Sequence, residues 1–126
     1  MRSLITALVI AALLGAASEI YMYRLEKASW ELTAINGEIS EAVSEEDYGA
    51  AKEAIDRLNA RMDDAEMFFG AMGDHEEMDM INMNIAELRG YIDAERGGDA
   101  ASKCLVLSYL FGHLPENSRL KLQNIF

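Results

Sequence analysis

The feature that most constrains this chain is an uncharged apolar segment close to its amino terminus. Residues 4–17 contain no ionisable side chain, and the apolar character extends to residue 23 with only Ser18 and Glu19 as polar interruptions. A helix needs roughly 20 mostly apolar residues to cross a membrane, and residues 4–23 reach that length if the two polar residues lie at the outer interface. We therefore expect a membrane anchor, or an uncleaved signal segment, over residues 1–23.

Two interpretations of this segment remain open, retention and cleavage. Arg2 gives a short positive leader, and the small residues 15–17 would suit a signal peptidase. Retention is favoured because apolar residues continue beyond the segment at steps of three and four, as in one long helix. The residues of this stripe are Tyr21, Leu25, Ala28, Leu32, Ile35, Ile39 and Ala42. The leader predicts a cytoplasmic amino terminus and a body outside the cell membrane.

The segment after this helix has the spacing of a second amphipathic helix. Ser44 is its expected N-cap, with acidic residues 45–47 in the electropositive first turn. Gly70 and Gly73 are its expected stop. Its apolar stripe is Tyr48, Ala51, Ile55, Leu58, Met62, Ala65 and Phe69.

Two further helices are expected in the last third of the chain. Asp74 is the predicted cap of one, which ends at the glycines 97–98, and Asp99 caps the other. The stripe of the first is Met78, Ile81, Ile85, Leu88 and Ile92. The last helix is expected over residues 100–111, closed by Gly112 and by Pro115, because proline disrupts a helix interior.

These segments predict an all-α fold. Short connections between sequential helices make them antiparallel neighbours, so we expect the membrane helix to continue into an up-and-down bundle of about four helices. Residues 24–126 would then form a single bundle domain with a short tail at the carboxyl end. The tail, residues 119–126, carries four large apolar residues, and it either packs back on the bundle or docks to a partner or lipid surface.

The charge distribution argues against nucleic acid as a partner. Residues 31–99 hold 19 acidic residues against 5 basic ones, a local charge of −14 in a chain of net charge −11. Such a field repels phosphate backbones. Cys104 is the only cysteine, so no intramolecular disulfide is possible, and we expect it to pack as a small apolar side chain.

Several short motifs resemble those of a known family of small bacterial proteins. They are Asp47-Tyr48 with Ala51, Phe69, the run from Asp74 to Asp79, Leu88 with Tyr91-Ile92, His113-Leu114-Pro115-Glu116 and Asn124-Ile125-Phe126. The resemblance is to membrane-anchored proteins catalogued only as a domain of unknown function and found mainly in spore-forming anaerobes. It implies a membrane-anchored helical protein and no reaction. Some relatives are encoded beside multi-pass membrane proteins, which implies an accessory role.

One set of residues has the chemistry of a metal site. His75 begins one predicted helix and His113 ends the next, so antiparallel packing would bring the two rings to one end of the molecule. Asp79 and Glu116 lie four and three positions away from them, and two imidazoles with two carboxylates could hold an ion such as Zn²⁺. The competing interpretation, capping of the helix ends by the same residues together with hydrogen bonds between the histidines and the acids, is favoured.

Other sequence features favour contact with proteins over catalysis. No nucleophile elbow, phosphate loop or HExxH motif is present, so we expect no enzyme activity and no cofactor. Met67, Phe68, Met80 and Met83 lie off the main stripes and predict an additional contact surface. Trp30 also lies off its stripe, either at a partner interface or against a neighbouring helix. We expect an accessory or scaffold subunit that contacts membrane lipid and a membrane-protein partner. The chain could also form a homo-oligomer. The alternative function is that of a sensor that binds a metal ion or a small ligand.

Overall fold

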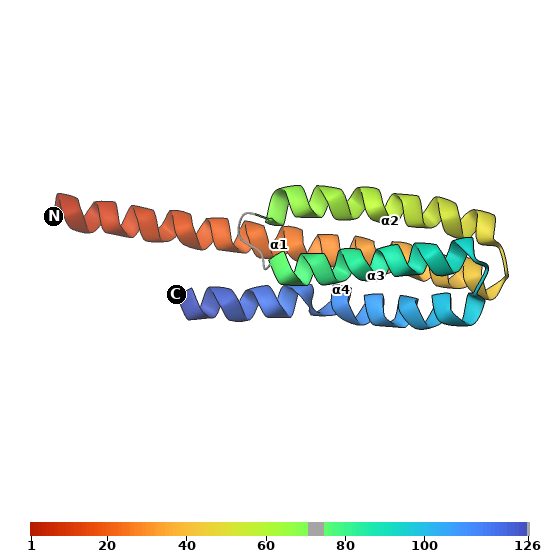
Figure 1. Cartoon of the computed structure of the whole chain (residues 1–126). Coiled ribbons are helices and arrows are strands. Elements are labelled where there is room, and N and C mark those ends of the chain that lie inside the picture. The colour runs from red at the N-terminus through yellow and green to blue at the C-terminus, as the bar shows by residue number, and fades with distance from the viewer. Residues whose placement is uncertain (71–74, 126) are drawn as a thin grey trace.

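The computed structural model describes residues 1–70 and 75–125, and nearly all of them are helical (Figure 1). No β-strand occurs in these ranges. Four helices follow one another along the chain. They are α1 (Arg2–Ser44), α2 (Tyr48–Phe69), α3 (His75–Asp93) and α4 (Gly97–Ile125). The predicted all-α class is confirmed.

The helices form an up-and-down bundle in which neighbours in sequence lie side by side (Figure 1). Helix α1 packs on α2 and α4, and α3 packs on the same two helices from the opposite side. Helices α1 and α3 are therefore diagonal partners, as in other four-helix bundles with short connections.

Helix α1 is uninterrupted from the apolar segment into the bundle, as the stripe predicted. Its 43 residues correspond to a rod about 65 Å long at 1.5 Å per residue. Figure 1 shows the beginning of α1 projecting beyond the other helices, with α4 reaching farther along α1 than α2 and α3 do. Among the described residues, α1 is the one helix long and apolar enough to cross a membrane. No residue of its apolar stretch of 18 residues is buried against the bundle.

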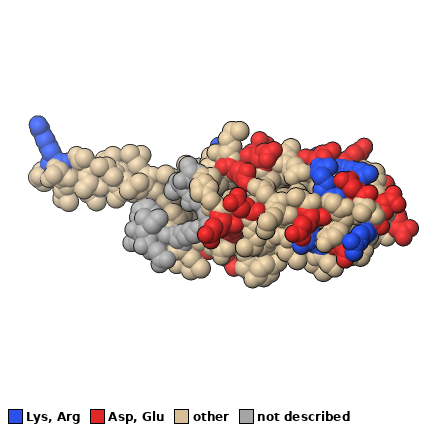
Figure 2. All heavy atoms as spheres, viewed as in Figure 1, with Lys and Arg blue, Asp and Glu red and all other residues tan. Residues whose placement is uncertain are grey.

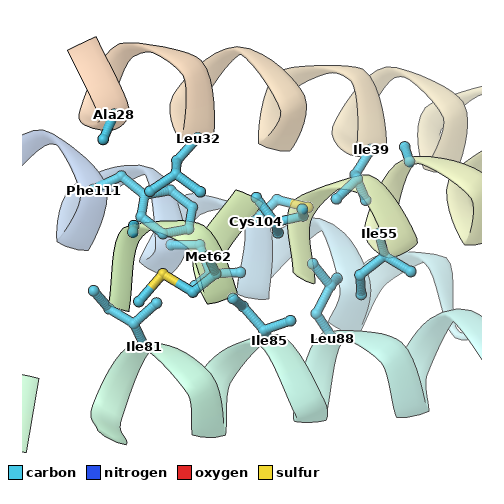
Figure 3. Close-up of a cluster of buried hydrophobic side chains, with 14 of the residues drawn as sticks. Ala28, Leu32, Ile39, Ile55, Met62, Ile81, Ile85, Leu88, Cys104 and Phe111 are labelled. Carbon is cyan, nitrogen blue, oxygen red and sulfur yellow. The ribbon is translucent and has the colours of Figure 1, made fainter. Parts of the chain in front are cut away.

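The interior of the bundle is built from the predicted stripes. Every stripe residue of α3 is buried, as are those of α2 from Ala51 onward, while Tyr48 is partly buried. Helix α1 contributes buried residues only from Leu25 onward. Figure 3 shows Leu32, Met62, Ile85 and Phe111 meeting from the four helices. Cys104 also lies in this core, as expected.

The turn between α1 and α2 differs from the prediction. Ser44 does not cap α2; it is the last residue of α1, where its hydroxyl donates to the carbonyl of Glu41 at 2.7 Å. Asp47 is the cap, because its carboxylate accepts from the backbone N–H of Ala50 at 3.1 Å. Glu46 adopts a left-handed φ of 57°, and the Asp47 N–H bonds back to the Ala42 carbonyl at 2.9 Å. These features define a Schellman motif.

The turn between α3 and α4 repeats the same motif. Glu95 has a φ of 55°, and the Arg96 N–H bonds to the Tyr91 carbonyl at 2.8 Å. The expected stop at the glycines 97–98 is wrong, because α3 already ends at Asp93 and Gly97 begins α4. Asp99 consequently lies in the first turn of α4 and does not precede it.

The prediction that Pro115 closes the last helix is also wrong. Helix α4 contains Pro115 and continues to Ile125, so residues 119–125 of the predicted short tail form the last turns of this helix. Proline has no N–H to donate to the carbonyl four residues earlier, which is that of Phe111. The buried Ser29 hydroxyl of α1 donates to this carbonyl instead, at 2.6 Å. A partner 82 positions away in the chain thus satisfies the group that the proline leaves free.

At the other connection, α2 ends at Phe69 and Gly70 follows in the right-handed conformation. The predicted stop at Gly73 and the predicted cap at Asp74 lie outside the described residues.

Candidate functional site at the base of the bundle

We call the end of the bundle where α1 projects from it the base. Three aromatic side chains lie there, because α1 leaves the bundle beside the last turn of α2. The rings of Tyr21 and Phe69 meet edge to face at 5.3 Å between centroids, and those of Phe68 and Phe69 at 4.7 Å. Pairs of this geometry stabilise a contact beyond the area they bury. The cluster packs α1 against the last turn of α2 at the base.

A hollow of about 600 Å³ lies between α1 and α2 at the base. Its polar lining consists of three basic side chains and two carboxylates. These are Arg24, Lys27, Arg61, Glu31 and Asp64, with Tyr23 and Phe68 among the aromatic neighbours. A volume of this size falls in the range of small-ligand sites.

The basic side chains of the hollow differ in whether they form an ion pair with a carboxylate. The Arg61 guanidinium binds Glu31, with Nε 2.5 Å from Oε2. The guanidinium of Arg24 lies 4.5 Å from the centroid of the Phe68 ring, a cation–π contact. Among the described residues, no carboxylate lies within ion-pair distance of Arg24 or Lys27. These two cations therefore remain available to an anion.

The residues of the predicted metal site do not converge. His113 and Glu116 lie together, with Nε2 and Oε2 3.9 Å apart, but the His113 ring also stacks on Tyr109 and its Nδ1 contacts the Tyr109 carbonyl at 2.8 Å. Within residues 1–70 and 75–125, no three His, Cys, Asp or Glu side chains gather where they could hold one metal ion. His75 and Asp79 are exposed at the start of α3. The structure therefore provides no preformed ligand set for the hypothesis.

The base does hold the beginning of α3 against the second half of α4. The Asn117 amide of α4 donates to the Glu77 carboxylate of α3 at 2.9 Å. Because Glu77 follows His75 by two residues and Asn117 follows His113 by four, both histidines belong to this end of the bundle. The antiparallel packing that the metal-site hypothesis requires is therefore present, but the predicted ligands do not form one site.

Sequence reasoning missed two buried polar residues on α1. Ser29 and Asn36 are spaced by one heptad, and both donate to backbone carbonyls of α4. The Asn36 amide reaches the Cys104 carbonyl and the Ser108 hydroxyl, each at 2.8 Å. A polar residue at a core position fixes the register of packed helices. The signal in the sequence is the recurrence of small polar residues seven positions apart beside the apolar stripe.

The Cys104 thiol is a part of the core and has no place in a reactive site. Burial raises its pKa to about 11, so the thiol is protonated at neutral pH and is a weak nucleophile.

The outward face of α4 carries exposed apolar side chains. Leu105, Val106 and Tyr109 lie within four residues of one another, and Leu120 continues the same side. Residues 100–126 contain a single acidic residue, Glu116, whereas residues 31–99 contain 19, and acidic patches are visible on the face of the bundle drawn in Figure 2.

Two other predicted contact features are exposed. Met67 and Met83 each leave more than half of their surface uncovered, and Phe68 and Met80 leave somewhat less than half. Trp30 is 81 % exposed, so the interpretation that it packs on a neighbouring helix is wrong.

These features define a class of protein: a small four-helix bundle on a helix long and apolar enough to cross a membrane. The chain belongs to the family described as Domain of unknown function (DUF4363), whose model matches residues 20–125. The match begins where α1 enters the bundle and includes all of α2, α3 and α4. No curated protein and no solved structure matches the chain.

Proposed function

We propose that this protein is a single-pass, membrane-tethered accessory or scaffold subunit that acts by protein contact and catalyses no reaction. The observation that carries the proposal is the continuity of α1. Its first half is apolar and unburied, while its second half supplies core residues such as Leu32 and Ile39. A helix shared in this way would transmit the position of a membrane segment directly to the bundle.

The short positive leader favours a cytoplasmic amino terminus and a bundle outside the cell membrane, while Arg24 and Lys27 after the apolar segment reduce the charge asymmetry. The base of the bundle would then rest at the outer membrane surface. The projecting rod is tan over nearly all of its length in Figure 2, in contrast to the acidic bundle, as expected for a segment surrounded by lipid.

We propose the outward face of α4 as the surface that binds a helix of a membrane-protein partner. Leu105 and Tyr109 are one helical turn apart and are 75 % and 63 % exposed. Exposed apolar side chains grouped on an otherwise charged domain are typical of an interaction site. The low acidity of this face removes the repulsion that the rest of the bundle would exert on another acidic surface.

The test is photo-crosslinking in native membranes from a reactive amino acid placed at position 109. We expect a crosslink to one integral membrane protein, and loss of its co-purification when Leu105 and Val106 are both changed to Ser. A matched control places the reactive amino acid at Asp63 on α2, which is exposed and acidic.

A crosslink between two copies of this chain at position 109 would replace the proposed partner by a homo-oligomer. Equal crosslinking from positions 109 and 63, or none from either, would contradict the assignment of the α4 face.

A further inference from the structure

We propose that the hollow between α1 and α2 binds the phosphate-containing headgroup of an anionic phospholipid. This inference rests on the proposed membrane tether, because the lipid would be one that surrounds the anchor. The structural basis is the juxtaposition of Arg24, Lys27 and Arg61 with aromatic side chains at the base of the bundle.

The first argument is the level of the hollow along α1. Arg24 and Lys27 follow directly on the apolar residues 4–23, and their Cα atoms lie within about 6 Å of the end of that segment along the helix axis. The headgroup region of a bilayer extends roughly 5–8 Å beyond the hydrocarbon on each side. The two cations are therefore at the depth of lipid phosphates when residues 4–23 span the membrane.

The second argument is the pairing of charge. Glu31 is held by Arg61, so Arg24 and Lys27 face Asp64 as the one other carboxylate lining the hollow. The guanidinium of Arg24 lies over the Phe68 ring, and a guanidinium carries five N–H donors with which it can bind phosphate oxygens. Tyr23 is 68 % exposed and is the type of side chain enriched at membrane interfaces.

The third argument is the contrast with the rest of the domain. Residues 31–99 carry a charge of −14, so the bundle as a whole is repelled by an anionic membrane. The attraction between the basic side chains of the hollow and an anionic lipid would oppose this repulsion where the domain meets the bilayer. A basic hollow at any other position of the bundle would not have this effect.

The experiment uses the full chain extracted in a neutral detergent. Native mass spectrometry measures the binding of dihexanoyl phosphatidylglycerol, of dihexanoyl phosphatidylcholine and of inorganic phosphate. We expect phosphatidylglycerol to bind in preference to phosphatidylcholine. The double variant Arg24→Gln/Lys27→Gln should weaken that binding by about 30-fold, from about 1 kcal/mol for each basic side chain near an anionic lipid surface.

Matched controls separate the hollow from general charge. Lys52→Gln/Arg57→Gln removes the same charge from α2 outside the hollow, and it should leave the preference unchanged. Arg24→Lys/Lys27→Arg keeps the charge in place and should retain binding within a few-fold. Circular dichroism of each variant reports whether the bundle is folded; if the Gln variant is unfolded, the charge-reversed pair Arg24→Glu/Lys27→Glu and the Arg61→Gln variant provide the comparison.

Three outcomes would overturn the proposal. They are equal binding of the two lipids, an equal loss in the two double Gln variants, and binding of inorganic phosphate as tight as that of phosphatidylglycerol, which would indicate a soluble anion as the ligand. Failure of the membrane tether is seen separately, as a protein that leaves the membrane in a carbonate wash, and it would not by itself alter the lipid preference measured in detergent.

Discussion

The two halves of α1 are made from one continuous helix and lie in opposite environments. In the first half, apolar residues occupy all sides of the helix and remain exposed, with Leu13 at 65 %. In the second half, apolar residues recur at steps of three and four, and Leu32 is fully buried. The difference shows that periodicity, more than apolar content, decides which part of a helix enters a protein core.

The largest expected effect comes from the same substitution made in each half. Leu32→Ala should lower the free energy of unfolding of the bundle by about 2–5 kcal/mol, because it leaves a cavity among four helices. Leu13→Ala should change it by less than about 0.5 kcal/mol, since the Leu13 side chain is largely exposed and contributes nothing to the core. Urea unfolding of the full chain in detergent, followed by circular dichroism, measures both. Equal midpoints for the two variants would show that the halves do not differ as described.

The next effect concerns reactivity at the buried seam between α1 and α4. With a pKa near 11, Cys104 should react with iodoacetamide at pH 8 about 100-fold more slowly than an ordinary exposed thiol. The control is a Ser102→Cys/Cys104→Ser variant, which moves the thiol to the exposed side of α4. Similar rates for the two proteins would place Cys104 outside the core.

The same shift has a consequence for stability at high pH. The pKa of the Cys104 thiol is higher in the folded protein than in the unfolded chain, where it is about 8.5. The resulting stability is complete below the unfolded pKa and is lost as pH rises toward about 11. A Cys104→Ala variant should lack this alkaline loss. An unchanged pH profile in that variant would contradict the assignment.

A third effect tests the link between Ser29 and Pro115. Ser29→Ala should lower stability by about 1–3 kcal/mol, because the buried Phe111 carbonyl loses its donor. In a Pro115→Ala background the restored backbone N–H can bond to that carbonyl, so the same substitution should cost much less. A double-mutant cycle on unfolding free energies measures the coupling. Additive effects would mean that the hydroxyl does not replace the missing N–H.

The smallest effect lies at the end of α1. Glu46 has a left-handed φ of 57°, which costs a residue with a Cβ about 1 kcal/mol that glycine avoids. Glu46→Gly should therefore stabilise the bundle by about that amount. Glu41→Gly, inside α1, should destabilise it by about 1 kcal/mol. Thermal unfolding distinguishes the two, and shifts of the same sign would argue against the left-handed turn.

Much of the fold could be predicted because the stripes are local patterns. The spacing from Ala51 to Phe69 and from Met78 to Ile92 identified core faces, and these residues are buried. The extent of α4 could not be predicted, because a helix continuing through Pro115 depends on the Ser29 hydroxyl of a distant helix. The turns were misplaced for a related reason, since Glu46 and Glu95 take the left-handed position usually given to glycine.

The candidate site was less accessible to sequence reasoning. His75 and His113 suggested a metal site because imidazole is a common metal ligand. The order of the helices correctly predicted that the two histidines lie at one end of the bundle. Whether side chains converge depends on their rotation about each helix, which the sequence does not specify. The hollow was missed because Arg61 and Arg24 are 37 positions apart, and only the packing of α1 on α2 brings them together.

The most direct test of the central claim, that one helix joins a membrane segment to the bundle, is the intact mass of the protein recovered from carbonate-washed membranes. The account predicts a membrane-bound chain that retains residues 1–23, because the apolar half and the bundle half belong to the same uninterrupted α1. A soluble product beginning near Ser18 would contradict it.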